Sequence, residues 1–342
     1  MIRALSPSGK ALNTPLKYEI AWGNATKQIA VKAFAGLQVQ CPKCHRQGSL
    51  ISKWVPKTPV KPLFVCHWNG NGSYRKCSIN NNDAMSVRGK VGLMRPDILK
   101  VLRMGEPFVL FSGGQDSLCL LSYLNNLARG IGKEITALHA DTTAGFPEVE
   151  RYVRRICRTL GVRLVTVRPH ANYFDLAKKW GIPGAKSRWC CETLKVAPIR
   201  KFLAGIKGSK VVFDGIRAAE SYLRATYVPI WYHPAFRCIS VSPIFRWSDK
   251  KVADYIQAQN LPKSPVANLQ TSAECWCGAY KTKMDFEALL SIHPEIFDKL
   301  VEVEQAQKGK YTFLYERGKQ IPLLSLRQKR SRFLSPPEHD NS

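Results

Sequence analysis

A polar, glycine-rich turn interrupts an apolar stretch of the chain and is made of Ser112, Gly113, Gly114, Gln115, Asp116 and Ser117. Such a turn between a strand and a helix directs backbone N–H groups and the positive end of the helix dipole at an anion. Its glycines permit close approach of a phosphate, its serines add hydroxyl donors, and Asp116 is placed to cap the helix or to help hold Mg²⁺. The turn therefore predicts a phosphate site, and it differs from the P-loop, which ends in Gly-Lys-Ser/Thr.

Cysteines are the second set of residues that could do chemistry, because eight of the eleven are grouped. The groups are Cys41, Cys44, Cys66 and Cys77, then Cys190 and Cys191, then Cys275 and Cys277. We find no secretory signal, so the grouping favours metal binding or catalysis in a reducing compartment over a disulfide scaffold. The isolated Cys119, Cys157 and Cys238 lie within or beside apolar sequence and are predicted to fill the core.

The N-terminal cysteines have the spacing of a zinc ribbon, with a CPKC knuckle followed by a wider pair. The predicted zinc ligands are Cys41, Cys44, Cys66 and Cys77. His45 or His67 could replace one of them as a ligand. The zinc would stabilise a small β domain that lacks its own core. The same segment interleaves cations with aromatic rings, which suits contact with RNA or single strands; these residues are Lys43, Arg46, Lys53, Lys57, Lys61, Arg75, Lys76, Trp54, Phe64, Trp68 and Tyr74.

From residue 107 onward the hydrophobic pattern alternates between strands and helices. It predicts strands over 107–111, 135–140, 162–167 and 210–216, and helices over 116–129, 147–160, 171–180 and 195–204. This alternation is typical of an α/β fold, a parallel twisted sheet with helices on both faces that binds its ligand at the carboxyl ends of the strands. The phosphate-binding turn follows the first of these strands.

The chain is expected to comprise five parts. They are a basic β/zinc-ribbon domain over 1–80, a linker and helix over 81–104, a nucleotide-binding α/β domain over 105–260, a helical region with the second cysteine pair over 261–325, and a flexible basic and polar tail over 326–342. No apolar run approaches the roughly 18 residues that cross a bilayer, so no membrane partner is expected. We expect a cytoplasmic protein, with organelle import as the alternative because the first eighteen residues are basic and free of acid.

The composition is strongly basic, with 52 Lys and Arg against 25 Asp and Glu and a formal net charge of +27. Residues 1–80 contain twelve Lys or Arg and one acid, Glu19, which gives that segment +11. A generally basic proteome could produce such a charge. A polyanionic partner accounts for it better, because phosphate neutralisation and counterion release supply most sequence-independent affinity for nucleic acid. The charge therefore favours a nucleic-acid partner over a small anion alone.

The Ser-Gly-Gly-x-Asp-Ser turn after a strand resembles the PP-loop of the ATP pyrophosphatase superfamily. In that superfamily the loop grips the leaving pyrophosphate while a substrate oxygen attacks the α-phosphate of ATP. The stretches ALHADTTAGFPEVERYV (137–153) and FDGIRAAESYLRA (213–225) resemble two further motifs of one branch. That branch holds phosphoadenosine-phosphosulfate (PAPS) reductases, adenosine-phosphosulfate (APS) reductases and DNA-phosphorothioation sulfurtransferases. The resemblance covers about 105–305 and implies an adenine nucleotide alpha hydrolase-like fold.

The resemblance also implies roles for particular residues, with ATP and Mg²⁺ as cofactors. Asp116, Asp141 and Arg217 would be catalytic, and Arg217 and Arg224 would contact phosphate or sulfate, a task that suits guanidinium. Glu220 would orient one of these arginines. Without the neighbouring motifs, the same Arg and Glu residues would be interpreted as an ion pair on a helix surface. Gln115 stands where the family often has Lys.

The two later cysteine pairs resemble a cluster-binding pattern of APS reductases and phosphorothioation enzymes. There, a Cys-Cys pair followed by a basic residue and Pro, together with a later Cys-x-x-Cys, binds a 4Fe-4S cluster. The matching residues are Cys190, Cys191, Cys275 and Cys277, with Lys195 and Pro198 after the first pair. The second pair departs from the pattern, because it is Cys-x-Cys. Zinc and redox-active thiols therefore stay open as alternatives to the cluster.

Three functions are compatible with these features. A reductase would bind APS or PAPS, but such enzymes use a late mobile cysteine as nucleophile and no cysteine follows Cys277 in this sequence. A nucleic-acid-modifying enzyme would use ATP to adenylate its target, with tRNA favoured over DNA, and install sulfur from a donor protein or sulfide. A zinc-ribbon binding protein with a degenerate nucleotide fold is disfavoured by the intact turn and Asp141. We therefore expect an ATP-dependent adenylating sulfurtransferase.

Overall fold

The structure is a computed structural model of these 342 residues. It describes residues 37–40, 47–50, 93, 95–184, 187–225, 227, 229–233, 235–266, 275–279, 281–316 and 318–334. The zinc ligands predicted at Cys41, Cys44, Cys66 and Cys77 lie outside the described residues, as do the basic and aromatic residues among them. In the described part, no helix is long and apolar enough to cross a membrane.

The chain divides into two compact units, each built from several segments. The first comprises Met1–His139, Val153–Val165 and Arg200–Lys263, and the second comprises Ala140–Tyr152, Thr166–Ile199 and Ser264–Ser342. Within the first unit, β1 (Leu37–Gln40) and β2 (Gln47–Leu50) form an antiparallel pair.

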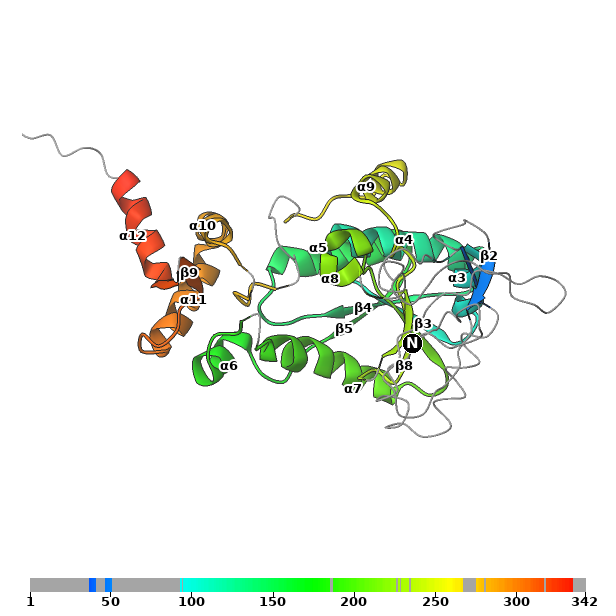
Figure 1. The fold of residues 1–342 in the computed structure, drawn as a ribbon, viewed down its shortest axis with the longest axis horizontal. Helices are drawn as coiled ribbons and strands as arrows, with labels where there is room; N and C mark the ends of the chain where they lie inside the picture. The colour runs from blue at the N-terminus through cyan, green and yellow to red at the C-terminus, as the bar shows by residue number, and fades with distance from the viewer. Residues whose placement is uncertain are drawn as a thin grey trace, which may run out of the picture. The chain divides into compact units, whose positions relative to one another are not determined.

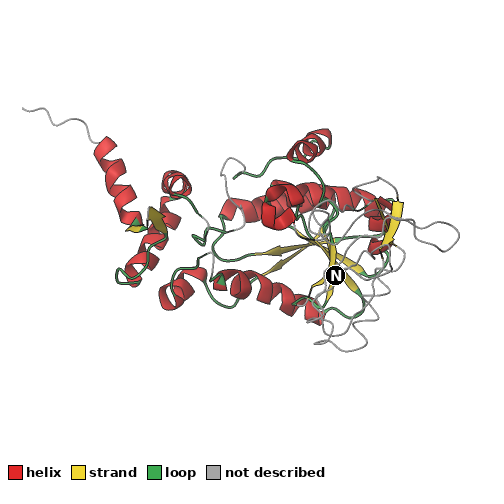
Figure 2. Ribbon diagram, in the orientation of Figure 1, coloured by secondary structure: helices red, strands yellow, loops and turns green. Residues whose placement is uncertain are grey.

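A six-stranded sheet forms the centre of the α/β fold (Figure 2). Its order is β5 (Arg163–Val167), β4 (Thr136–Ala140), β3 (Glu106–Leu110), β6 (Lys210–Phe213), β8 (Cys238–Val241) and β7 (Ile230–His233). β3 pairs in parallel with β4 and β6, and β6 pairs in parallel with β8. β7 runs antiparallel to β8 at the edge of the sheet. The predicted parallel α/β sheet is confirmed, apart from this antiparallel edge strand.

Helices cover both faces of the sheet, as predicted. Figure 1 shows α4 (Gln115–Arg129) and α7 (Ala197–Gly205) on opposite faces. The Phe202 ring of α7 meets the Phe108 ring of β3 edge to face, with 5.6 Å between the centroids. The central strands are apolar on both faces, which is what two covering layers require. Full burial of one such side chain stabilises the fold by about 1.5–3 kcal/mol.

Three further helices complete the layers around the sheet. They are α3 (Arg95–Leu102), α5 (Pro147–Leu160) and α9 (Asp249–Ala258). The bounds of α5 match the predicted helix over 147–160, and Pro147 occupies its first position, where a missing N–H is tolerated. α9 packs on α4. The ring centroid of Tyr123 in α4 lies 5.2 Å from that of Trp247, which precedes α9, and the Trp247 centroid lies 5.5 Å from that of Tyr255 in α9.

The second unit is mainly helical. It contains α6 (Tyr173–Trp180), a π-helix η2 (Cys191–Val196), α10 (Lys283–Ile292), α11 (Pro294–Ala306), the hairpin strands β9 (Leu314–Glu316) and β10 (Lys319–Ile321), and α12 (Leu323–Leu334). Glu304 of α11 is buried and accepts hydrogen bonds from the N–H groups of Phe313 (2.9 Å) and Leu323 (2.6 Å). This carboxylate fastens both ends of the hairpin to α11.

Two features of the second unit differ from the expectation. The helix expected over 195–204 begins earlier, because the π-helix η2 precedes α7 and carries Cys191 as its first residue. The tail expected from 326 is helical as far as Leu334, since α12 continues through it. Residues 335–342 lie outside the described residues.

Candidate functional site

The glycine-rich turn joins β3 to α4 at the carboxyl end of the strand. Gly113 has φ 84°, a conformation that glycine adopts without strain. The Ser117 hydroxyl donates to the Gly114 carbonyl oxygen (2.9 Å), and its oxygen lies 3.0 Å from the Ser112 hydroxyl oxygen. Leu118 N–H donates to the Gly114 carbonyl oxygen (2.9 Å), so the N–H groups of the preceding residues lie at the open end of the helix. The turn is thus preformed as a cradle for an anion.

The loop after β6 packs directly against this turn. A side chain at Gly215 would come within 3.3 Å of the backbone of Asp116 and Ser117. The preceding Asp214 is buried, and its carboxylate accepts hydrogen bonds from the hydroxyls of Ser240 (2.9 Å) and Ser242 (2.5 Å). Burial raises the pKa of Asp214 above the usual range, although these hydrogen bonds oppose the shift. Asp214 therefore fixes the loop that supports the turn.

Arg217, from the same loop, links the turn to α9. Its Nε lies 2.8 Å from Asp116 Oδ1 as an ion pair, and its Nη2 lies 2.7 Å from Asp249 Oδ1. Its Nη1 donates to the carbonyl oxygen of Trp247 (3.2 Å), and the residue is only 5% exposed. Burial raises the pKa of Asp116, while the adjacent guanidinium acts to lower it. The guanidinium is thus held beside the phosphate cradle with its plane fixed from three sides.

Glu220 contacts both predicted arginines. The short helix η3 (Ala218–Glu220) precedes α8 (Tyr222–Ala225). Glu220 accepts a hydrogen bond from the backbone N–H of Arg217 (2.8 Å) and forms an ion pair with the Arg224 guanidinium. The ion pair with Arg224 is the kind expected as the alternative, and the orienting role of Glu220 stays a prediction. The structure brings together the turn, Arg217 and Glu220 in the first unit.

Asp141 follows β4 and belongs to the second unit. Its Oδ1 accepts a hydrogen bond from Thr143 N–H (2.9 Å), and its Oδ2 lies 2.8 Å from Arg168 Nε. Thr143 has φ 61°, a strained conformation for a β-branched residue, and its hydroxyl accepts from Tyr173 N–H at the start of α6 (2.8 Å). Asp141 thus holds a strained loop, and Arg168 is a partner that the sequence did not indicate.

The four later cysteines come together in the second unit. The sulfur atoms of Cys275 and Cys277 lie 3.7 Å apart, and the Cys190 thiol hydrogen-bonds both Cys191 and Cys277. Among the described residues, no three His, Cys, Asp or Glu side chains are arranged to hold a single metal ion. A 4Fe-4S cluster does not need that arrangement, because each thiolate binds a different iron atom. The donor set therefore fits a cluster by its chemistry.

The thiols differ in acidity because they hydrogen-bond one another. The hydrogen bond with Cys191 raises the pKa of Cys190 to about 12, and the same bond lowers the pKa of Cys191 below its usual value. The hydrogen bond with Cys190 is the main cause that raises the pKa of Cys277, to about 11. Lys195 also lowers the pKa of Cys191. Cys191 is thus the most readily ionised of these three thiols in the metal-free protein.

An aromatic shell fixes the second cysteine pair. Trp276, between the two cysteines, is fully buried, and its backbone N–H donates to the carbonyl oxygen of Ala144 (2.5 Å). The Tyr173 hydroxyl donates to the Cys277 carbonyl oxygen (2.6 Å), and Lys281 Nζ lies 4.3 Å from the centre of the Trp276 ring. Burial lowers the pKa of Lys281. Two of the four thiols, Cys190 and Cys277, are therefore buried, and a cation lies nearby.

Gly278 provides a test of this packing. It has φ 79°, and a side chain there would overlap the ring of Phe313, whereas Gly309, with φ 75°, has no atom within 4 Å of such a side chain. We expect Gly278→Ala to lower the free energy of unfolding by about 3 kcal/mol or more, and Gly309→Ala by about 1 kcal/mol. Urea unfolding measures both. Equal losses in the two variants would contradict the packing described here.

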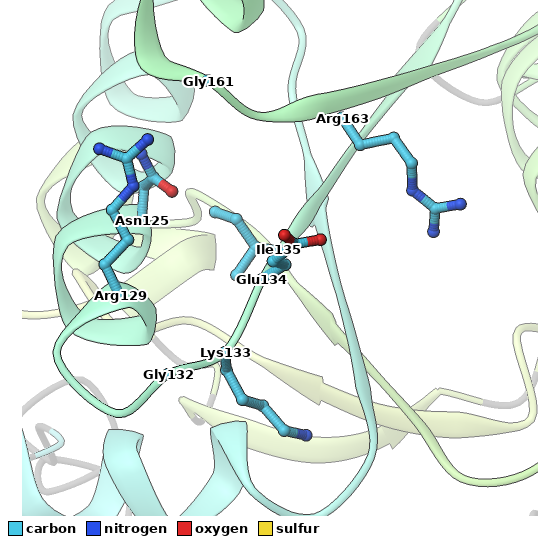
Figure 3. Close-up of a pocket in the computed structure, with 8 residues that line it drawn as sticks. All are labelled: Asn125, Arg129, Gly132, Lys133, Glu134, Ile135, Gly161 and Arg163. Carbon is cyan, nitrogen blue, oxygen red and sulfur yellow. The ribbon is translucent and has the colours of Figure 1, made fainter.

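A cavity of about 450 Å³ lies at the opposite, amino-terminal edge of the sheet (Figure 3). It is lined by Asn125, Arg129, Gly132, Lys133, Glu134, Ile135, Gly161 and Arg163. Each of its cations already has a partner: Arg129 donates to the carbonyl oxygen of Leu160 at the end of α5 (2.9 Å), Lys133 donates to that of Gly105 (2.9 Å), and Arg163 pairs with Glu106 (2.9 Å). Basic side chains at helix C-termini are a common stabilising arrangement, so we assign this cavity no catalytic role.

Sequence reasoning missed Asp214, Asp249, Arg168, Tyr173 and Trp276. Asp214 had a signal, because a charged residue directly after the apolar run VVF (211–213) is unusual at the end of a central strand. Asp249 follows Ser248, the N-cap of α9, and belongs to none of the motifs identified in the sequence. Arg168 and Tyr173 are recognised as part of the site only through partners that the folded chain brings close.

Comparisons with known proteins agree with this arrangement. Residues 106–271 match the phosphoadenosine phosphosulfate reductase domain. An uncharacterized protein of Methanocaldococcus jannaschii is 31% identical over 177 residues, or 51% of this chain and 36% of that protein. The adenosine 5'-phosphosulfate reductase of Rhodococcus opacus is 28% identical over 163 residues, or 47% of this chain and 63% of that protein. The match thus spans less than two thirds of either relative.

Among solved structures, the U34-tRNA thiolase NcsA from Methanococcus maripaludis with its 4Fe-4S cluster aligns over 83% of this chain and 89% of that chain. The sequence identity is 16% and the TM-score is 0.40, too low to carry an inference about this chain. The similarity rests on the domain match, and the match includes the phosphate-binding turn and its supporting loop. Residues 106–271, just under half of this chain, match the phosphoadenosine phosphosulfate reductase domain, and the chain is similar there to the PAPS reductase-like branch of the PP-loop superfamily.

Proposed function

We propose that this protein binds ATP at the Ser112–Ser117 turn, adenylates a nucleic-acid target and supports transfer of sulfur to it. The observation that carries the proposal is the preformed turn with Arg217 fixed beside it, since phosphate chemistry is catalysed mainly by positioned N–H groups, cations and metal ions. The four grouped thiols in the second unit add a site suited to sulfur chemistry.

The proposed activation step breaks the bond between the α- and β-phosphates of ATP. An oxygen of the target attacks the α-phosphorus, and pyrophosphate leaves with the electron pair of the broken bond. The open end of α4 and the serine hydroxyls of the turn would hold the leaving pyrophosphate. Asp116 would hold Mg²⁺ with the carboxylate that now pairs with Arg217, and Arg217 would stabilise the charge that develops on the phosphates.

The second step replaces the activated oxygen with sulfur. With hydrosulfide as nucleophile, the new bond to sulfur forms as the bond to the adenylated oxygen breaks, AMP leaves, and no oxidant or reductant is consumed. A 4Fe-4S cluster bound by Cys190, Cys191, Cys275 and Cys277 would supply a carrier for sulfide. The chain's own contribution is to fix the second cysteine pair through Trp276 and Tyr173.

The nucleic-acid target is supported by the charge of the chain. A net charge of +27 exceeds what one nucleotide needs, and residues 1–80 carry a disproportionate share of it. We favour tRNA over a DNA backbone phosphate because aromatic side chains are interleaved with cations there, an arrangement suited to stacking on unpaired bases. A sulfur donor protein or free sulfide would be the second substrate.

A sulfonucleotide reductase is the second candidate, because the named curated relative with a stated activity is an APS reductase. The two functions differ in their products. A reductase would release sulfite and AMP from APS without consuming ATP, whereas the proposed enzyme would form pyrophosphate from ATP only with its target present.

Mass spectrometry of nucleosides and dinucleotides separates these functions. RNA and DNA from cells with and without the gene would be digested and compared. We expect one thio-nucleoside of tRNA to disappear when the gene is deleted and to return with the wild-type gene. Loss of a phosphorothioate dinucleotide would move the target to DNA. Unchanged nucleosides together with a requirement for reduced sulfur would contradict the proposal and favour the reductase.

A further inference from the structure

Trp180 ends α6 with 52% of its surface exposed, which is unusual for so large an apolar ring. It meets the ring of Trp189 nearly at a right angle, with 5.3 Å between the centroids and 79° between the planes. The two indole planes are nearly perpendicular, and we call this pair of rings the corner. A flat aromatic ligand can stack on one ring while its edge meets the other.

Trp189, one of the two rings of the corner, is held in place before any ligand binds. Trp189 stacks on Tyr173 with 5.9 Å between the centroids and 13° between the planes, and its Nε1–H donates to the carbonyl oxygen of Gly181 (3.2 Å). Tyr173 is fully buried, and its hydroxyl holds the carbonyl oxygen of Cys277 (2.6 Å). Little conformational freedom therefore remains to be lost at Trp189, which favours binding. The corner is also connected to the cysteine site within the same unit.

Exposed cations are adjacent in sequence to the two indoles. Lys178 and Lys179 directly precede Trp180 and are exposed, and Arg188 directly precedes Trp189 and is also exposed. Lys178 is paired with Glu302 (2.7 Å), while Lys179 has no carboxylate within 4 Å among the residues that the structure describes. Exposed aromatic rings next to such cations match the chemistry of a single-stranded nucleic acid, which offers flat bases and a negative backbone.

We propose that the corner formed by Trp180 and Trp189, with Lys179 at its rim, binds an unpaired base of the nucleic-acid target and the phosphate next to it. This inference rests on the proposed function and adds the surface that would present the target to the thiol site. A membrane surface would require several apolar side chains side by side, and a protein interface would not require cations on both indole-bearing segments.

The test measures binding of a fluorescent single-stranded oligonucleotide and of unmodified tRNA by polarisation across a salt series. Trp180→Ala is expected to weaken binding about 5- to 150-fold with an unchanged dependence on salt, because stacking releases no counterions. Lys179→Ala is expected to flatten the slope of log K against log salt by about 0.7. Tyr315→Ala is the matched control, since Tyr315 is 55% exposed in the same unit, and it should bind like the wild type.

The outcomes separate this inference from the proposed function. If the wild type binds nucleic acid and Trp180→Ala binds equally well, the corner is not the binding surface, and the proposed function is unaffected. If Tyr315→Ala weakens binding as much as Trp180→Ala, the effect is not specific to the corner, and the inference is overturned. If the wild type binds neither oligonucleotide nor tRNA, the proposed function itself fails.

Discussion

Asp116→Ala is expected to lower nucleic-acid-dependent release of pyrophosphate about 100- to 1,000-fold. The substitution removes the carboxylate that would hold Mg²⁺ at the turn and also removes the partner of Arg217 Nε, so the guanidinium loses one of its three anchors. The Km for ATP should change much less than kcat, because the N–H groups of the turn remain. Initial rates of pyrophosphate release, measured with ATP and bulk tRNA, provide the comparison.

The matched control for this variant is Asp254→Ala. Asp254 is an exposed carboxylate on α9 that pairs with Lys250 (2.7 Å), so its removal changes the net charge equally without touching the turn. It should retain the wild-type rate. An Asp116→Ala variant that folds and keeps more than half of the wild-type rate would remove Asp116 from the mechanism.

Cys190→Ala is expected to abolish binding of the 4Fe-4S cluster. Cys190 is buried and hydrogen-bonds two of the other three thiols, so its loss both removes one ligand and separates the two cysteine pairs. Anaerobically reconstituted wild type should be brown and contain about four iron and four sulfide ions per chain, and the variant should contain little of either. Iron and acid-labile sulfide analysis and visible absorbance provide the measurement.

Cys157→Ala is the control for this second variant. Cys157 is buried and isolated from the other cysteines, and burial raises the pKa of its thiol to about 12, so it is an inert core side chain. The Cys157→Ala variant should bind the cluster like the wild type. A wild type that binds zinc and no iron after anaerobic reconstitution would contradict the cluster and favour the zinc alternative.

The sequence predicted those elements whose characteristic residues are close neighbours along the chain. The helix over 147–160 was predicted with its bounds because Pro147 marks its start and apolar residues follow at helical spacing. The turn at 112–117 was recognised because six adjacent residues carry its chemistry. The short edge strand β7 was missed, and its antiparallel pairing depends on β8 rather than on a pattern of its own.

The contacts that shape the site join residues far apart in the sequence. The Asp214 carboxylate accepts hydrogen bonds from hydroxyls that lie 26 and 28 positions further along the chain. The Tyr173 hydroxyl donates a hydrogen bond to a carbonyl oxygen that lies 104 positions further along. No local pattern encodes such pairs. The grouping of Cys190 and Cys191 with Cys275 and Cys277 was predicted only through the family resemblance, and the π-helix that carries Cys191 left no signal in the sequence.

The most direct test of the central claim is to identify which bond of ATP is broken. ATP labelled on the α-phosphate would be incubated with the purified holoprotein, hydrosulfide and unmodified tRNA, and the products would be separated. The account predicts labelled AMP together with an equal amount of pyrophosphate, formed only when the nucleic acid is present. Labelled ADP with inorganic phosphate, or AMP formed equally without nucleic acid, would contradict it.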